Sequence, residues 1–181
     1  MMMGSMAAAL AAHVVLPLSF LSALPGSFPE LREAAPPPVA ASPCDLVTLA
    51  EVALALGGTP SGPFPMPESV DEESGARMSG CGFERGDLGI AIMIAAFDSR
   101  AAVERAMEIL AEGDDDGDSI RLLPERGPGE RSLWGSSEDG AIWVALQGQR
   151  ILTVTLFGEI PDPASHRDAM RALAEAVVSR M

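Results

Sequence analysis

The sequence contains no lysine and no tyrosine, and it has only two histidines. A chain without lysine cannot form a lysine Schiff base or use the lysine of a phosphate-binding loop, and one without tyrosine has no phenolic acid for catalysis. His13 lies in an apolar N-terminal run, so His166 is the one imidazole of the expected folded part. These absences exclude several classes of enzyme before any motif is considered.

Positive charge is also scarce. Twelve basic residues, all arginine, stand against 26 acidic residues, and the formal net charge is -14 with a pI near 4.4. Such a chain is repelled by phosphate backbones and by anionic membrane surfaces. We therefore expect no nucleic-acid partner, and contact with a membrane only through the N-terminal segment.

The N-terminal segment contains an uncharged apolar run, residues 6–24, long enough for the core of a signal peptide or for one membrane span. A stretch rich in proline and alanine follows, with the composition of an extended tether. The sequence thus predicts a signal peptide or N-terminal membrane anchor (1–26), a tether (27–43) and a single domain (44–181). Cleavage and retention of the run both stay open. In either case the domain is extracytoplasmic: secreted, periplasmic or N-terminally anchored.

Cysteine is limited to two residues, Cys44 and Cys81. An even number of cysteines in an exported chain predicts a disulfide. Closing a loop of this length would stabilise a small domain by ~4 kcal/mol through the entropy of the unfolded chain. The residues before Cys44 are Ala-Ser-Pro, unlike the approach to a lipid-modified cysteine. A disulfide is therefore favoured over lipidation at Cys44.

Periodicity predicts three main helices and six strands. A capping box of Thr48 and Glu51 starts a helix that ends at Gly57, a second helix ends near Glu112, and a third follows Pro163. Residues 57–80 show no periodicity and are predicted to form a long loop. Alternating apolar residues predict a hairpin within 81–97 and further strands at SIRLLP, RSLWGSS, AIWVALQG and RILTVTLFG.

This order of elements, α-β-β-α-β-β-β(-β)-α, predicts an α+β fold with one disulfide. We expect an antiparallel sheet of about five or six strands with the helices packed on one face. The last two strands are apolar on both faces. One face must meet the helices, and the other is covered by something else or offers a hydrophobic surface.

The leading hypothesis for function places a binding surface on that sheet. Trp143, Leu152 and Val154 share one face in the expected hairpin register. We expect an exported, non-enzymatic domain that binds an apolar small molecule or an envelope protein near these three residues. No catalytic residue and no cofactor are predicted.

An acidic run after the second helix suggests calcium. Asp114, Asp116, Asp118 and Glu125 match the four carboxylate positions of an EF-hand loop. The glycine required at the sixth position is replaced by Ser119, so a solvated charged turn fits better. A weak metal site at Asp114, Asp116 and Asp118, in a calcium-stabilised structural or interaction protein, is one alternative function.

Other candidate catalytic groups are few. Ser165 and His166 are adjacent in one expected helical turn, which points their side chains along the surface instead of toward each other in a pocket. The neighbouring carboxylates Glu138 and Asp139 leave a carboxylate-based envelope hydrolase as the other alternative.

Several short motifs resemble a family of small secreted or lipid-anchored bacterial proteins that is common in actinobacteria. The matching residues are Pro43-Cys44, Thr48, Ala50-Glu51-Val52, Ala55-Leu56-Gly57, Cys81 and Gly148. The resemblance spans most of residues 42–180; it implies a shared fold and nothing about catalysis. More distantly, the layout is similar to extracytoplasmic sensor domains of some bacterial receptor kinases, which implies ligand or partner binding by analogy alone.

Overall fold

The computed structural model describes residues 42–112, 120–158, 160 and 162–181. All of these lie in the compact unit formed by Glu33–Met181. The helical elements are η1 (Pro43–Leu46), α1 (Leu49–Leu56), α2 (Arg100–Glu112), η2 (Pro163–His166) and α3 (Arg167–Val178). The strands are β1 (Ser61–Val70), β2 (Arg77–Arg85), β3 (Leu88–Ala96), β4 (Leu123–Glu125), β5 (Arg131–Ser137), β6 (Gly140–Gln147) and β7 (Arg150–Gly158).

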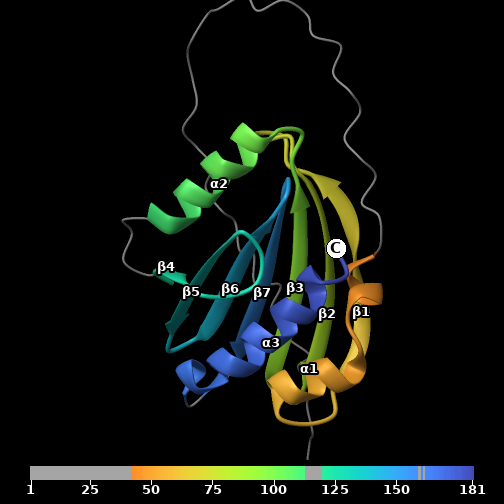
Figure 1. Ribbon diagram of the computed structural model, residues 1–181. Helices are drawn as coiled ribbons and strands as arrows, with labels where there is room; N and C mark the ends of the chain where they lie inside the picture. Colours follow the sequence, from red (N-terminus) through yellow and green to blue (C-terminus); the bar gives the residue numbers. More distant parts are fainter. Residues whose placement is uncertain (1–41, 113–119, 159, 161) are drawn as a thin grey trace, which may run out of the picture. The chain divides into compact units, whose positions relative to one another are not determined.

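The strands form one antiparallel sheet in the order β1-β2-β3-β7-β6-β5-β4 (Figure 1). The α+β class is therefore confirmed, but the sheet has seven strands, more than the five or six predicted. The missed strand is β1, which lies within the segment predicted to be a loop. Its three prolines are typical of a loop, yet an edge strand tolerates proline because only one side of its backbone must pair.

The predicted capping box at the start of α1 is present. The Thr48 hydroxyl accepts a hydrogen bond from the Glu51 backbone, and the Glu51 carboxylate accepts one from the Thr48 backbone. The helix ends at Gly57, whose backbone φ is 69°, a value that residues other than glycine rarely adopt. Local sequence alone thus determines both ends of this helix.

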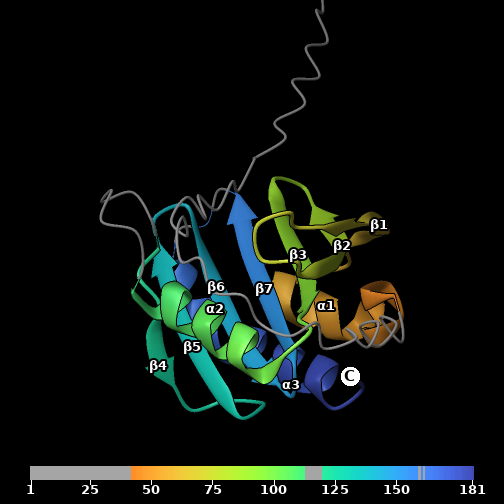
Figure 2. The same cartoon turned by 90° about the horizontal axis from the view of Figure 1, so that it is seen from above.

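Helices cover both faces of the sheet, so the prediction that they pack on one face is wrong. α1 and α3 lie side by side across one face (Figure 1). α2 buries Val103 and Met107 against Val144 and Ile151 on the opposite face. Seen from above, α2 lies over the half of the sheet that contains β4, β5 and β6 (Figure 2). The physical reason is that β6 and β7 are apolar on both faces, and each face requires cover.

The predicted disulfide is confirmed. Cys44 and Cys81 are bonded, with their Cα atoms 5.1 Å apart, within the usual range for a disulfide. The bond joins η1 to the centre of β2 and encloses α1 and β1 between its ends. Disulfides of this kind persist in oxidising compartments, which indicates an extracytoplasmic location. Among the described residues, no helix is long and apolar enough to cross a membrane.

Candidate functional site: an open face of the sheet

The three residues predicted to line a binding surface are in the hydrophobic core. Trp143, Leu152 and Val154 are fully buried, and they pack in one cluster with Met170 and Leu173 of α3. Trp143 pairs with Val154 in the sheet, so the predicted register is correct. The prediction that these residues offer an exposed surface is wrong, because α1 and α3 cover this face.

A partly exposed apolar surface lies on the opposite face of the same sheet, toward β1. Two rows of paired residues cross four strands there: one row runs from Met66 through Met93 to Thr153, and the next from Phe64 to Thr155. Paired residues of neighbouring strands point their side chains to the same face. We call this surface the open face. Its apolar and small residues are Phe64, Met66, Met78, Gly80, Gly82, Gly89, Ala91, Met93, Thr153, Thr155 and Phe157, and the exposed Glu84, which pairs with Gly89, lies at its end.

Within the described part of the chain, the large side chains of the open face stay accessible. Phe64 is 47% exposed, Met66 37% and Phe157 43%. Met78 and Met93, on the same face, are half-buried. Exposed large apolar side chains that gather on one surface are typical of a site that contacts a ligand or a partner.

Glycines shape the open face. A Cβ atom at Gly89 would overlap the ring of Phe157, and one at Gly80 would collide with the side chains of Met66 and Met93. Because these glycines have no side chains, the phenyl ring of Phe157 and the side chains of Met66 and Met93 occupy the space that a Cβ atom would fill. Flexible methionine side chains adapt to differently shaped partners, so the surface suits an apolar ligand without a rigid pocket.

The sequence carried a signal for this face. In β3, large isoleucines alternate with smaller or flexible residues: Gly89, Ala91, Met93 and Ala95. The isoleucines Ile90, Ile92 and Ile94 are buried in the core. Small residues on the other face leave space for side chains from neighbouring strands or for a bound molecule.

The sheet edge beside the open face is protected against pairing with a further strand. β1 carries Pro63, Pro65 and Pro67, which have no backbone N–H. Its pairing with β2 is also irregular between Ser61 and Phe64 and between Met66 and Ser69. Proline and bulges are the usual means by which edge strands avoid edge-to-edge association. These features protect the edge of the sheet against the addition of a further strand.

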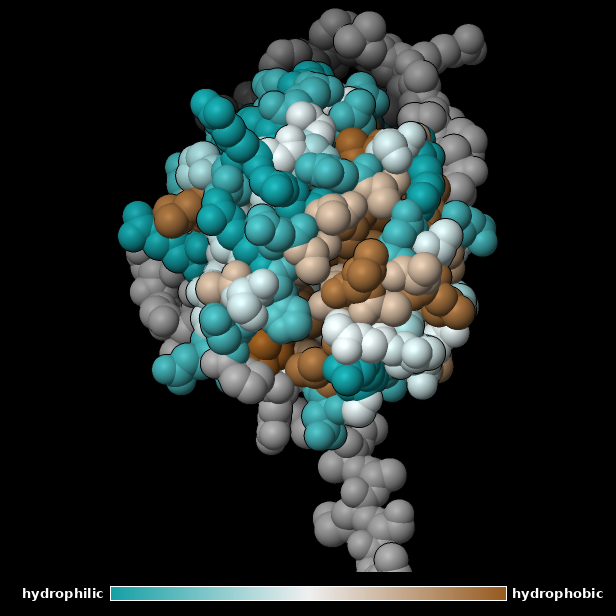
Figure 3. Space-filling view, turned by 60° about the horizontal axis from the view of Figure 1, so that its bottom comes forward, coloured by the Kyte–Doolittle hydropathy of each residue, from teal (hydrophilic) through white to brown (hydrophobic). Residues whose placement is uncertain are grey.

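The outer side of α1 is a second exposed apolar surface. Glu51 is the one charged residue of the helix, and the apolar side chains of Leu54, 78% exposed, and Leu49 point away from the core. In Figure 3, apolar residues gather over α1 and the adjoining part of α3. This surface is a competing candidate for the binding role.

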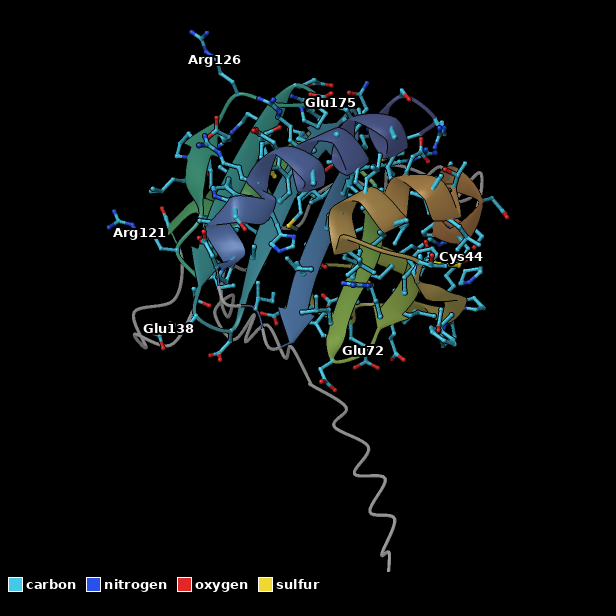
Figure 4. All side chains as sticks on the ribbon, turned by 90° about the horizontal axis from the view of Figure 1, so that it is seen from below. Cys44, Glu72, Arg121, Arg126, Glu138 and Glu175 are labelled. Carbon is cyan, nitrogen blue, oxygen red and sulfur yellow. A yellow bond between two sulfur atoms is a disulfide. The ribbon has the colours of Figure 1, made fainter. Side chains whose placement is uncertain are left out.

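The candidate catalytic groups do not converge. Glu138 and Asp139 are exposed, and Glu138 lies at the tip of a hairpin, well apart from Glu72 and Glu175 (Figure 4). The described residues include no group of three or more His, Cys, Asp or Glu that could hold a metal ion.

His166 has a structural position. Its Nδ1 atom is 3.0 Å from the Ala55 carbonyl oxygen, at the C-terminal end of α1. The hydroxyl of Ser165 donates a hydrogen bond to the Asp162 carbonyl oxygen instead of approaching the imidazole. The two side chains therefore tie down backbone, and they do not form a nucleophile and base pair.

The acidic run can be followed only in part. Asp114, Asp116 and Asp118 lie outside the described residues. Glu125, the residue at the twelfth position of the calcium pattern, forms an ion pair with Arg167 on α3. In the described part of the chain, the carboxylate at this position already has a cationic partner.

An ion pair joins α1 to the C-terminal end of the chain. The Arg180 guanidinium donates hydrogen bonds of 2.6 and 2.9 Å to the two carboxylate oxygens of Glu51, and a third to the Leu46 carbonyl oxygen. Arg180, together with the Thr48 hydrogen bonds, lowers the pKa of Glu51 to about 2. The carboxylate is thus held in its charged form far into the acid range.

Replacing Arg180 with methionine should lower the free energy of unfolding slightly at neutral pH, since the pair is partly exposed. The pKa of Glu51 is lower in the folded chain than in the unfolded chain, so the stabilisation is present above about pH 4.5 and is lost toward about pH 2. Urea unfolding across this range should show the difference between variant and wild type shrinking with acid. Arg171→Met is the control, because Arg171 makes only longer contacts on the same helix. A constant difference at all pH values would contradict this account.

The chain matches no protein-family model and no curated protein. Among solved structures it is similar to the extracellular domain of PknH from Mycobacterium tuberculosis, with a TM-score of 0.46 and 14% sequence identity. That match covers 76% of this chain and 95% of the PknH chain. The resemblance to small secreted or lipid-anchored actinobacterial proteins stays a prediction.

Proposed function

We propose that this protein is an extracytoplasmic, non-enzymatic binding domain that contacts an apolar small molecule or an apolar surface of an envelope protein through the open face. One observation supports this most directly: Phe64 and Met66 are exposed on the same face of the sheet as the half-buried Met93, and Phe157 is exposed further along that face, over Gly89. Isolated exposed apolar residues need no explanation, but several on one face of a sheet do.

The extracytoplasmic part of the proposal is supported by two independent features. The disulfide is typical of an oxidising compartment, and the apolar run at residues 6–24 has the length of an export signal or anchor. Whether that run is cleaved determines if the domain is released or stays tethered at the membrane.

The two alternatives have less support. A carboxylate-based hydrolase needs at least two converging acids, and Glu138 and Asp139 are exposed at a hairpin tip. A calcium-stabilised protein depends on the acidic run at Asp114, Asp116 and Asp118. Melting with and without millimolar calcium tests that alternative, since an ion that binds the folded chain raises the melting temperature.

Binding of a neutral apolar dye such as Nile red tests the proposal, because a neutral dye is not repelled by the negative charge of the chain. We expect wild type to enhance its fluorescence saturably. Met66→Glu should weaken binding about tenfold or more, equivalent to about 1.4 kcal/mol, because the ligand would have to desolvate a carboxylate. Leu54→Glu places the same charge on the second apolar surface and should leave binding unchanged.

The matched pair of variants decides between the two surfaces. Weakened binding in Leu54→Glu alone would move the site to α1 and overturn the assignment to the open face. Wild-type protein that fails to bind the dye or other neutral apolar probes would contradict the ligand-binding proposal itself. Circular dichroism of each variant shows that any change in binding is not a loss of fold.

A further inference from the structure

Two thioether sulfurs converge over one glycine in the open face. A Cβ atom at Gly80 would lie within 3.0 Å of the sulfur atoms of both Met66 and Met93. The two sulfurs are therefore separated by at most twice that distance. They come from the strands on either side of β2, and both residues pair directly with Gly80 in the sheet.

The rest of the chain offers no thiolate to compete with these sulfurs. Both cysteines of the sequence are joined in the disulfide, so the thioethers of methionine are the soft donors that remain. Thioethers bind soft, monovalent ions such as Cu(I), whereas carboxylates and carbonyls suit Mg²⁺ and Ca²⁺. A pair of methionines is thus a ligand set with a definite chemical preference.

We propose that Met66 and Met93 form a binding site for a soft monovalent metal ion, Cu(I) or Ag(I), on the open face. This inference goes beyond the proposed function and does not depend on an apolar ligand. Met78 lies two residues from Gly80 along β2 on the same face, in the next row of paired residues.

The geometry allows one ion to bridge the two sulfurs. Zinc–thiolate bonds in proteins are about 2.3 Å long, and on that scale one ion spans sulfurs about 4.6 Å apart. Methionine has three rotatable side-chain bonds, and small rotations bring both sulfurs into this range. Met66 is partly exposed, which gives an ion access from solvent. The net charge of -14 attracts cations toward the chain.

Titration of the full chain with Ag(I) in chloride-free buffer tests the site, because Ag(I) requires no reductant that would attack the disulfide. We expect the carbon-13-labelled methyl signals of Met66 and Met93 to shift, while those of the fully buried Met107 and Met170 do not. Even outer-shell changes weaken metal affinity 10- to 100-fold, so Met66→Leu or Met93→Leu should weaken binding at this site by at least about tenfold. Zn²⁺ should not reproduce these methyl shifts.

Met181→Leu is the matched control, since it removes a half-buried methionine that packs against the core on the opposite face. Leucine replaces methionine at nearly constant volume, so these variants should fold normally. Unchanged affinity in Met66→Leu/Met93→Leu, or shifts confined to the methionines at the N-terminus, would overturn the metal site. Nile red binding to wild type and the silver-induced methyl shifts are measured independently of each other. The two proposals can therefore fail separately.

Discussion

Replacing both Cys44 and Cys81 with serine is expected to lower the free energy of unfolding by about 4 kcal/mol. The two cysteines are 37 residues apart, and the lost constraint lets the unfolded chain explore many more conformations. A domain of this size is typically stable by about 5–15 kcal/mol. The loss is therefore a large fraction of the total, and urea unfolding should show a clear shift in midpoint.

The location of the disulfide predicts which elements lose protection from hydrogen exchange first when the bond is removed. The bond ties η1 to β2, and β1 is an edge strand with two irregular stretches of pairing. Hydrogen exchange in the double serine variant should therefore accelerate in η1, α1 and β1 before it does in β6 and β7. Wild type unfolded under reducing conditions is the control, and it should show the same loss of stability. Equal stability with and without the bond would mean that the disulfide does not hold this region.

Replacing Leu152 with alanine is expected to lower the free energy of unfolding by about 3 kcal/mol, the usual cost of a cavity at a fully buried leucine. Leu152 is 0% exposed on β7 and belongs to the cluster beneath α1 and α3. The next residue, Thr153, points to the open face and is half-buried. Thr153→Ala should change stability by less than about 1 kcal/mol.

These neighbours provide a matched test of which sheet face is the core, because they share a strand and differ in the face they point to. Urea unfolding measures the stability of both variants, and Nile red binding measures the proposed site. We expect Leu152→Ala to reduce stability and leave the dye affinity of the folded protein nearly unchanged. A neutral Leu152→Ala together with a severe Thr153→Ala would show that the faces have been assigned the wrong way round.

Much of the architecture follows from local sequence. The capping box of Thr48 and Glu51 and the helix end at Gly57 each depend on residues a few positions apart. The period of two in β6 and β7 correctly places Trp143 and Val154 on one face. The pairing of the two cysteines was also predictable, because an exported chain with two cysteines has one intramolecular disulfide to form.

The position of the candidate site was not predictable in the same way. Both faces of β6 and β7 are apolar, so the pattern does not say which face the helices cover. For this reason the prediction placed Trp143, Leu152 and Val154 on an exposed surface, whereas all three are buried in the core. β1 was missed because its prolines are compatible with a loop, and its strand conformation depends on pairing with β2 across the intervening residues.

The sequence by itself determined the α+β class, the cross-link, the acidic charge and the sets of side chains that share a face, because these depend on composition and on contacts between near neighbours. Only the tertiary structure decided that α1 and α3 cover one face while α2 covers part of the other, and that β1 completes the edge. It also decided that Met66 and Met93 meet over Gly80. Such contacts join segments far apart in the chain, and their formation depends on the packing of the whole sheet.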